Sequence, residues 1–226
     1  MLTVNIKVPQ VQETFYKDSD LIYIKNTILN VRQKYGKFID ELSNVLEIPK
    51  ELIYAMIYVE SAGKENEVSP ANAYGLLQIT KPTAEDIFAL MRGQIQQNPK
   101  LKQLVIRLFS DKYTCLLSKA YPGQKECLTT NDLLDPYKNL LIGSLIIRYL
   151  LDKYRGRLDA LVIAYNRAGL FQNVKIGNTP ADTLNLEKTP ETRNYIIKLL
   201  GRNSALGVAI FLKEQNQIWK KLQFKF

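Results

Sequence analysis

The residues from Glu51 to Glu60 constrain the fold of this chain more than any other stretch. Eight apolar or aromatic residues, LIYAMIYV, stand between these two glutamates. A helix that is apolar almost all round is stable only when other elements cover it on every side. Pro49 fits the first turn of such a helix, where proline is tolerated. The sequence therefore predicts a buried, nearly central helix that ends in a carboxylate, Glu60.

The remainder of the chain has mainly helical periodicity. We expect further helices over residues 20–35, 37–46, 81–91, 101–108, 136–154, 158–168, 189–201 and 204–222, with a break at Gly36 and a long loop over residues 170–188. Residues 2–8 alternate apolar and polar side chains, as strands do, and Pro9 ends the alternation. We therefore expect a mainly α fold with very little β. It consists of an N-terminal extension over residues 1–18, as an edge strand or attachment arm, and one helical domain over residues 19–226.

The composition limits the chemistry that this chain can perform. Its 226 residues, 46% of them apolar and 23% charged, suit one sizeable globular domain. No apolar run reaches the roughly 18 residues that a membrane-spanning helix needs. The chain has no histidine, which excludes Ser-His-Asp and Cys-His nucleophiles and the commonest zinc ligand. Acid–base chemistry would fall to carboxylates, Tyr or Lys, and we expect no metal and no cofactor.

The net charge of +9 indicates an anionic partner. Nucleic acid and bacterial cell wall are both candidates, but no nucleic-acid-binding motif is present, so we expect no nucleic acid. The alternative is a solvated basic surface that serves solubility. The first ten residues contain no basic-then-apolar signal sequence. We therefore expect a cytoplasmic protein or one that leaves the cell by another route, such as lysis or transport in a virion.

Glu60 is the first candidate for a functional residue. Burial and the negative end of the helix dipole both favour its protonated form, which a general acid requires. The alternative is a structural glutamate paired with Arg or Lys at a helix end. Nearby, Ser61, Ser69 and Gln78 are polar residues among apolar neighbours, and Gly75 permits close backbone approach. Such groups suit a ligand rich in hydroxyls and amides.

Several short motifs resemble the catalytic domain of the soluble lytic transglycosylases, which has a lysozyme-like fold related to goose-type lysozyme. The motifs occur in the family's order and cover roughly residues 45–200. They are Glu60-Ser61, Ser69-Pro70, Gly75-Leu76-Leu77-Gln78-Ile79 with Pro82-Thr83-Ala84, Asp135-Pro136 with Asn139-Leu140 and Gly143, Ala164-Tyr165-Asn166, and Glu191-Thr192-Arg193-Asn194-Tyr195.

The resemblance implies cleavage of the β-1,4 bond between N-acetylmuramic acid and N-acetylglucosamine in peptidoglycan. Glu60 would act first as acid on the glycosidic oxygen and then as base on the muramoyl 6-hydroxyl, which closes a 1,6-anhydro ring. The substrate's acetamido group would replace a second carboxylate, so Glu65 and Glu67 are expected to be solvated. A hydrolytic muramidase and a non-catalytic wall-binding module remain alternatives.

The resemblance also implies roles for the other motif residues. Ser69 and Gln78 would contact the sugar, and Tyr165 would lie close to Glu60 and orient it or the substrate; a core aromatic is the alternative for Tyr165. Asn166 is expected beside the substrate as a supporting polar group. The remaining supporting residues are Ser61, Gly75 and Glu191.

Other parts of the chain depart from the family pattern. Residues 88–132 match no motif, so we expect an insertion that lines or caps the cleft. Within it, Cys115 and Cys127 form either a disulfide or two free thiols. Thr80 and Arg167 stand where the family often has other residues. The basic amphipathic residues 211–226 are expected to pack on the domain, with membrane docking as the alternative. A virion or secretion assembly is a further candidate partner, held through residues 1–18.

Overall fold

A computed structural model describes residues 10–118, 126–167, 170 and 173–223, with side chains through residue 215. Its helices are η1 (Asp18–Asp20), α1 (Leu21–Leu46), α2 (Lys50–Ser61), α3 (Lys81–Gln97), α4 (Pro99–Phe109), α5 (Tyr113–Ser118), α6 (Thr130–Leu134), α7 (Pro136–Lys153), α8 (Leu158–Asn166), α9 (Pro180–Leu186), α10 (Pro190–Leu200) and α11 (Ala205–Gln223). Strands β1 (Ala73–Tyr74) and β2 (Ile79–Thr80) form an antiparallel pair. The predicted mainly helical fold with very little β is confirmed.

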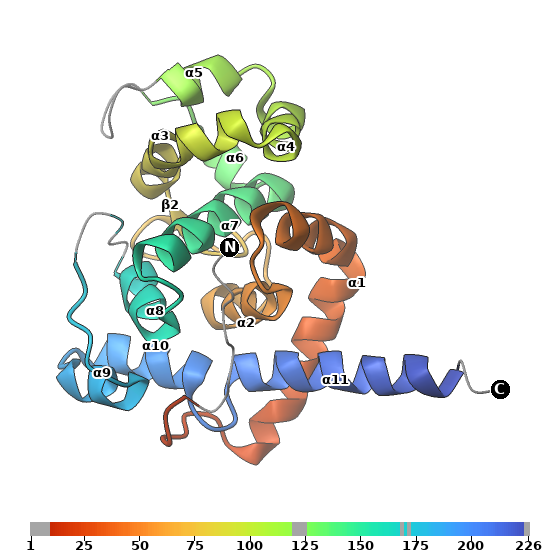
Figure 1. The fold of residues 1–226 in the computed structure, drawn as a ribbon, viewed down its shortest axis with the longest axis vertical. Coiled ribbons are helices and arrows are strands. Elements are labelled where there is room, and N and C mark those ends of the chain that lie inside the picture. Colours follow the sequence, from red (N-terminus) through yellow and green to blue (C-terminus); the bar gives the residue numbers. More distant parts are fainter. Residues whose placement is uncertain (1–9, 119–125, 168–169, 171–172, 224–226) are drawn as a thin grey trace.

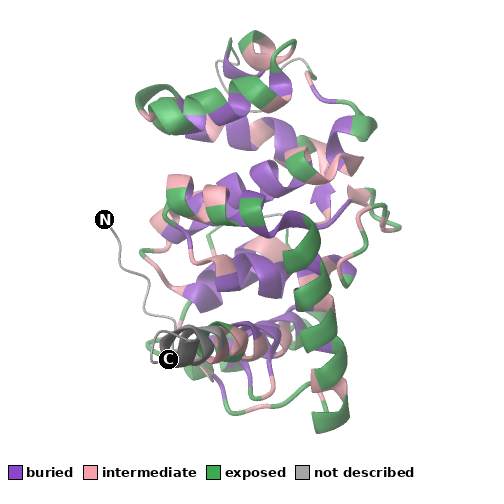
Figure 2. Ribbon diagram, turned by 90° about the vertical axis from the view of Figure 1, so that its right-hand side faces the viewer, coloured by how far each residue is buried: buried purple, intermediate pink, exposed green. Residues whose placement is uncertain are grey.

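Helix α2 is the buried helix that the sequence predicts. Ile53, Met56 and Ile57 have no exposed surface, and α1, α10 and α11 all pack on the helix. Figure 2 shows buried residues gathered in the middle of the molecule and exposed residues mainly on the outer helices. Burying side chains of this size stabilises the fold by about 1.5–3 kcal/mol each. The position of Glu60 is therefore fixed by three surrounding helices.

Helix α7 divides the domain into two parts (Figure 1). Helices α3, α4, α5 and α6 lie on one side of it, and α2, α8 and α10 lie on the other. Helix α11 crosses below α2, with which it makes its most extensive contact. The β1–β2 hairpin follows α2 and precedes α3 in sequence. It lies near the middle of the domain, next to both parts.

The predicted break at Gly36 is wrong, because α1 continues through it. A Cβ at Gly36 would lie 3.5 Å from the hydroxyl of Tyr54 on α2, an ordinary contact, and 3.3 Å from Cγ of Arg32 on α1 itself, so the packing of α2 does not require glycine here. Tyr35 and Ile39 are buried on either side. Their packing outweighs the cost of about 1 kcal/mol that glycine imposes inside a helix.

Helices α3 and α9 differ from the predicted ranges, and α5 and α6 form where no helix is expected. Helix α3 extends to Gln97 rather than ending near Met91. Helix α9 lies inside residues 170–188, for which a loop is expected. Thr179 starts α9, and its hydroxyl accepts a hydrogen bond from the backbone N of Asp182, which is a capping interaction that stabilises short helices.

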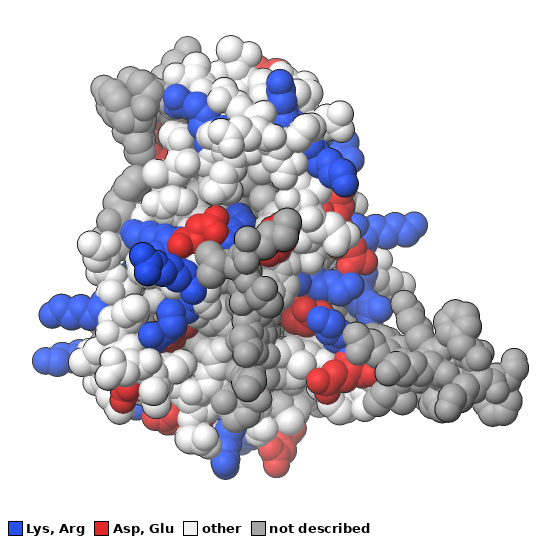
Figure 3. Space-filling model, viewed as in Figure 1, with Lys and Arg blue, Asp and Glu red and all other residues white. Residues whose placement is uncertain are grey.

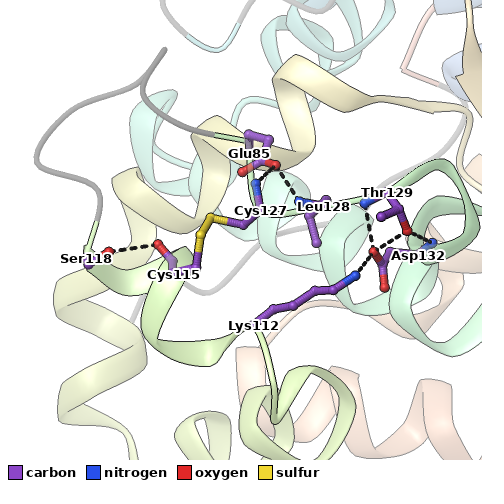
Figure 4. The surroundings of a disulfide bond; sticks show 8 residues. All are labelled: Glu85, Lys112, Cys115, Ser118, Cys127, Leu128, Thr129 and Asp132. Carbon is purple, nitrogen blue, oxygen red and sulfur yellow. Dashed lines mark hydrogen bonds and ion pairs between the residues drawn. A yellow bond between two sulfur atoms is a disulfide. The ribbon is translucent and has the colours of Figure 1, made fainter.

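Cys115 and Cys127 form a disulfide, which decides between the two alternatives (Figure 4). The carboxylate of Glu85, on α3, accepts hydrogen bonds from the backbone N atoms of Cys127 and Leu128 at 2.5 and 2.6 Å. The bridge joins α5 to the chain that precedes α6, and Glu85 holds the same chain against α3. Residues 109–132 are thereby fastened to the domain, apart from residues 119–125, which lie outside the described part.

The expected strand over residues 2–8 also lies outside the described residues. No helix in the described part of the chain is long and apolar enough to cross a membrane. On the face drawn in Figure 3, Lys and Arg side chains are spread out, with Asp and Glu among them. The positive net charge is therefore not gathered into one patch on that face.

Candidate active site

Glu60 lies in the last turn of α2, partly buried, and faces α10. The hydroxyl of Tyr195 donates a hydrogen bond to Oε1 of Glu60. Burial raises the pKa of Glu60 to about 7, and the opposing effects of the Tyr195 hydrogen bond and the positive charge of Lys198 are smaller. Glu60 is therefore a carboxyl that exchanges a proton near neutral pH, as an acid–base group must.

Tyr165, on α8, lies near Glu60 but points its hydroxyl elsewhere. Its hydroxyl donates a hydrogen bond to the backbone O of Leu77 at 2.9 Å. Burial and the negative charge of Glu60 raise the pKa of Tyr165 well above its ordinary value, so the phenol keeps its proton. The structure thus places Tyr165 between the carboxyl and the hairpin, and Tyr195 is the tyrosine that binds Glu60.

Gln78 lies in the turn between β1 and β2. Its backbone has a positive φ of 45°, which is uncommon for a residue with a side chain and is found more often at functional sites. Its side-chain nitrogen donates to the backbone O atoms of Glu67 and Gly75 at 3.1 and 3.0 Å. These bonds fix the side chain against the preceding loop.

A small pocket opens beside Gln78 and Tyr165. It is lined by Gln78, Ile79, Thr80, Thr83, Ile146, Ala164, Tyr165 and Leu170. The hydroxyls of Thr80 and Thr83 lie 2.9 Å apart in this lining. An apolar wall with a few fixed polar groups is the usual form of a ligand pocket. Glu60 itself does not line the pocket, and Tyr165 is the lining residue that the charge of Glu60 affects.

Ser61, Ser69 and Gly75 shape the loop that surrounds this pocket. Ser61 is buried, and its hydroxyl donates to the backbone O of Leu76 at 2.9 Å, which connects α2 to the hairpin. The hydroxyl of Ser69 accepts a hydrogen bond from the backbone N of Ala73 at 3.1 Å. Gly75 has a φ of 74°, where a side chain would be strained. These residues hold the loop in place, and Ser69 lies at its outer, more exposed end.

Asn166 and Glu191 occupy different environments. Oδ1 of Asn166 accepts a hydrogen bond of 2.8 Å from the hydroxyl of Thr192, so α8 is connected to α10 near Tyr195. Glu191 is exposed in the first turn of α10. The structure brings Asn166 to the edge of the cluster around Glu60 and leaves Glu191 on the surface. Their roles toward a substrate stay predictions.

Two residues contribute more than the sequence indicates. Tyr195 belongs to the recognised Glu-Thr-Arg…Tyr motif, and that motif is the signal that could have identified it. Asn139, on α7, has no exposed surface and connects three backbone groups around the hairpin. Its side chain accepts from Leu77 N at 2.9 Å and donates to the O atoms of Tyr74 and Leu133, both at 2.8 Å.

Glu65 and Glu67 do not join Glu60. Glu65 accepts a hydrogen bond from the hydroxyl of Tyr35 and lies 3.6 Å from Lys34. Glu67 lies 3.5 Å from Lys64. Neither is among the groups that shift the pKa of Glu60. No cluster of three or more His, Cys, Asp or Glu that could hold a metal exists among the described residues.

The fold and this site together define a lysozyme-like domain with one candidate acid–base carboxyl at the end of its buried helix. A family model described as the transglycosylase SLT domain matches residues 37–102 and 118–184, which is more than half of the chain. The chain therefore belongs to the transglycosylase SLT domain family, and the resemblance to the soluble lytic transglycosylases is confirmed. The gap between the two matched parts, residues 103–117, contains most of α4 and most of α5.

A solved structure gives the same fold. It is the lytic transglycosylase Slt of Pseudomonas aeruginosa, determined as an inactive mutant in which a glutamate is replaced by glutamine. The two share 15% identity with a TM-score of 0.50 over 79% of this chain. The chain spans about a quarter of that protein's length, since the match covers 24% of it. The match confirms the predicted fold, and the family model confirms the predicted family.

Proposed function

We propose that this protein is a lytic transglycosylase that cleaves the β-1,4 bond between N-acetylmuramic acid and N-acetylglucosamine in peptidoglycan without hydrolysis. The observation that carries the proposal is the Glu60–Tyr195 pair, in which a partly buried carboxyl has a pKa of about 7. At neutral pH this carboxyl is divided between its two protonation states, so it can give a proton in one step and take one in the next.

The reaction needs both states of Glu60 in sequence. Protonated Glu60 gives its proton to the glycosidic oxygen as the bond to the muramoyl C1 breaks. The substrate's acetamido oxygen stabilises the positive charge that develops at C1. Ionised Glu60 then takes the proton of the muramoyl 6-hydroxyl as that oxygen bonds to C1 and forms the 1,6-anhydro ring. The proton taken from the 6-hydroxyl replaces the one that stays on the leaving sugar, so the enzyme ends unchanged.

This route suits a site with one carboxyl. Glycosidases that use two carboxylates place them about 5–10 Å apart on opposite sides of the scissile bond. Glu65 and Glu67 instead pair with lysines and lie outside the Glu60–Tyr195 cluster. The fixed position of Gln78 and Tyr165 in the pocket lining supports their proposed role as groups that contact the sugar.

The proposal is tested with Glu60→Gln on purified sacculi. We expect release of soluble muropeptides to fall by about 10³-fold, within the range for loss of a general acid–base group, while the protein stays folded. The exposed Glu214 of α11 provides the control: Glu214→Gln should keep native activity. The similar Slt protein is inactive as a Glu-to-Gln mutant. Undiminished release by the Glu60 variant would refute the mechanism.

The products distinguish this proposal from the hydrolytic alternative. Mass spectrometry of released fragments should find 1,6-anhydromuramoyl ends, whereas reducing ends would support a muramidase that lets water attack C1. Binding to sacculi without any release would support the non-catalytic alternative. The expected virion or secretion context stays a prediction, and co-purification of the protein with such an assembly would test it.

A further inference from the structure

Residues 10–20 precede the part of the chain that the family model matches, yet they lie against the helix that carries Tyr195. Figure 1 shows them beside the junction of α10 and α11. The backbone N atoms of Gln10 and Val11 donate to the O of Leu200 at 2.8 and 3.2 Å, and Val11 is 1% exposed. This segment is therefore packed into the domain at the C-terminal end of α10.

The contact at Gly201 is too close for any side chain. The backbone N of Arg202 donates to the O of Glu13 at 3.0 Å. A Cβ at Gly201 would lie 2.4 Å from that same oxygen. Since real Cβ atoms do not approach other atoms so closely, glycine is what allows the segment to reach the end of α10.

The side chains of the segment reach both helices that form the Glu60–Tyr195 pair. The Phe15 ring lies under the ammonium of Lys198, with 4.6 Å between Nζ and the ring centroid, and Glu13 lies 3.4 Å from Arg193. The Tyr16 ring meets the Tyr58 ring edge to face, with centroids 5.8 Å apart.

These contacts bracket the pair. Arg193 and Lys198 stand on either side of Tyr195 along α10, and Tyr58 precedes Glu60 by two residues on α2. Phe15 and Tyr16 also pack on one another, with centroids 5.2 Å apart. The segment is therefore a short bridge from α10 to α2, located where the tyrosine meets the carboxyl.

We propose that Phe15 and Tyr16 are positioning residues that clamp α10 onto α2 and so hold the Tyr195 hydroxyl on Glu60. The catalytic part of this inference rests on the proposed function of Glu60. The structural part, that the two side chains hold α10 against α2, does not depend on that function. Neither side chain lines the pocket beside Gln78. The clamp therefore affects the protonation of the Glu60 carboxyl and makes no contact with the sugar.

Several polar groups face or adjoin Glu60 and bear on the test. They are Tyr195 and Lys198 on α10 and Tyr165 on α8. Tyr16 lies near Tyr195 and is not among the groups that shift the pKa of Glu60. On the other neighbours of α2, Lys213 of α11 pairs with Glu51 at the far end of α2, and α1 presents only Thr27 and the apolar Val31 near Gly63. Among them, Tyr195 donates a hydrogen bond to the ionised carboxylate. If Tyr195 moves away, the ionised form loses that donor and the pKa of Glu60 rises.

The experiment is an NMR titration of the Glu60 carboxyl carbon in the full chain, which requires no turnover. Tyr195→Phe sets the reference and should raise the pKa of Glu60 by about one unit, a tenfold change in proton affinity. Phe15→Ala/Tyr16→Ala should raise it by about half a unit, roughly threefold. Tyr16→Phe keeps the ring and should titrate as the native protein does. Tyr23→Ala, at a residue of α1 that is 68% exposed, is the matched control.

Two further measurements distinguish the proposed positioning role from a merely structural role of the segment. Under the proposal, the segment variant adds no further shift in a Tyr195→Phe background, and at pH 7 its kcat changes while its KM stays the same. The single variant Tyr16→Ala provides the same comparison if the double variant does not fold. An unchanged or lowered pKa, or an equal shift in the Tyr195→Phe background, would overturn the proposal. If native protein failed to cleave sacculi, the proposed function would fail and the titration would still test the clamp.

Discussion

Replacing Glu60 by glutamine should make the fold more stable at high pH than the native protein. The pKa of Glu60 rises from 4.5 to about 7 on folding. The folded protein therefore binds this proton more tightly than the unfolded chain does, and stability falls as pH rises between these two values. The shift of about 2.5 units corresponds to about 3 kcal/mol at 1.36 kcal/mol per unit. Glutamine carries no such pH-dependent cost.

The expected result is a difference that grows with pH. At pH 4 both proteins carry a neutral side chain at this position. By pH 8 the free energy of unfolding of Glu60→Gln, relative to the native protein, should have increased by about 3 kcal/mol. Urea denaturation at pH 4, 6 and 8 measures this, with equal m-values as the check that both unfold alike. Glu214→Gln, at an exposed carboxylate, controls for the loss of one charge.

Parallel stability curves for the two proteins would refute the reasoning. They would mean that Glu60 ionises in the folded protein as easily as in water. The burial that raises its pKa would then be absent, and the argument for a general acid at this position would lose its physical basis. A difference that grows with pH would show instead that the fold accepts a destabilising carboxyl at its centre.

Two further predictions concern the surroundings of the site. Asn139→Ala leaves the backbone groups of Leu77, Tyr74 and Leu133 without their partners. It should lower the free energy of unfolding by roughly 3 kcal/mol, since a buried unsatisfied group costs about 1–3 kcal/mol. A loss below about 1 kcal/mol in urea denaturation would show that water replaces the amide. Replacing Cys115 and Cys127 by serine opens a loop with a sequence separation of 12 and should cost about 3 kcal/mol in the chain-entropy model. Equal denaturation midpoints for oxidised and serine forms would contradict this.

The sequence is most informative where local pattern and burial agree. The apolar run between Glu51 and Glu60 can only be a buried helix, and the helix forms there. Gly36 shows the opposite case, because glycine signals a break in isolation, whereas the burial of Tyr35 and Ile39 around it keeps α1 continuous. Helix propensity is a local preference, and it is overridden when another helix packs at the same point.

The arrangement around Glu60 depends on contacts that no local pattern reveals. The motif containing Tyr195 is recognisable, but its hydrogen bond to Glu60 joins residues that are 135 positions apart. The same holds for Asn139, whose bond to Leu77 spans 62 positions. Sequence reasoning identifies the carboxyl and the loop, and only the fold indicates which tyrosine binds the carboxyl.

The separation of Glu60 and Tyr195 along the chain has a consequence for synthesis. At about 5–20 residues per second, a ribosome needs on the order of 10 s to add the 135 residues between them. During that time α2 exists without α10, and the carboxyl has neither its hydrogen-bond donor nor its burial. A nascent chain therefore carries no assembled Glu60–Tyr195 pair until almost the whole domain has been made. The order in which the helices are synthesised therefore delays assembly of the pair.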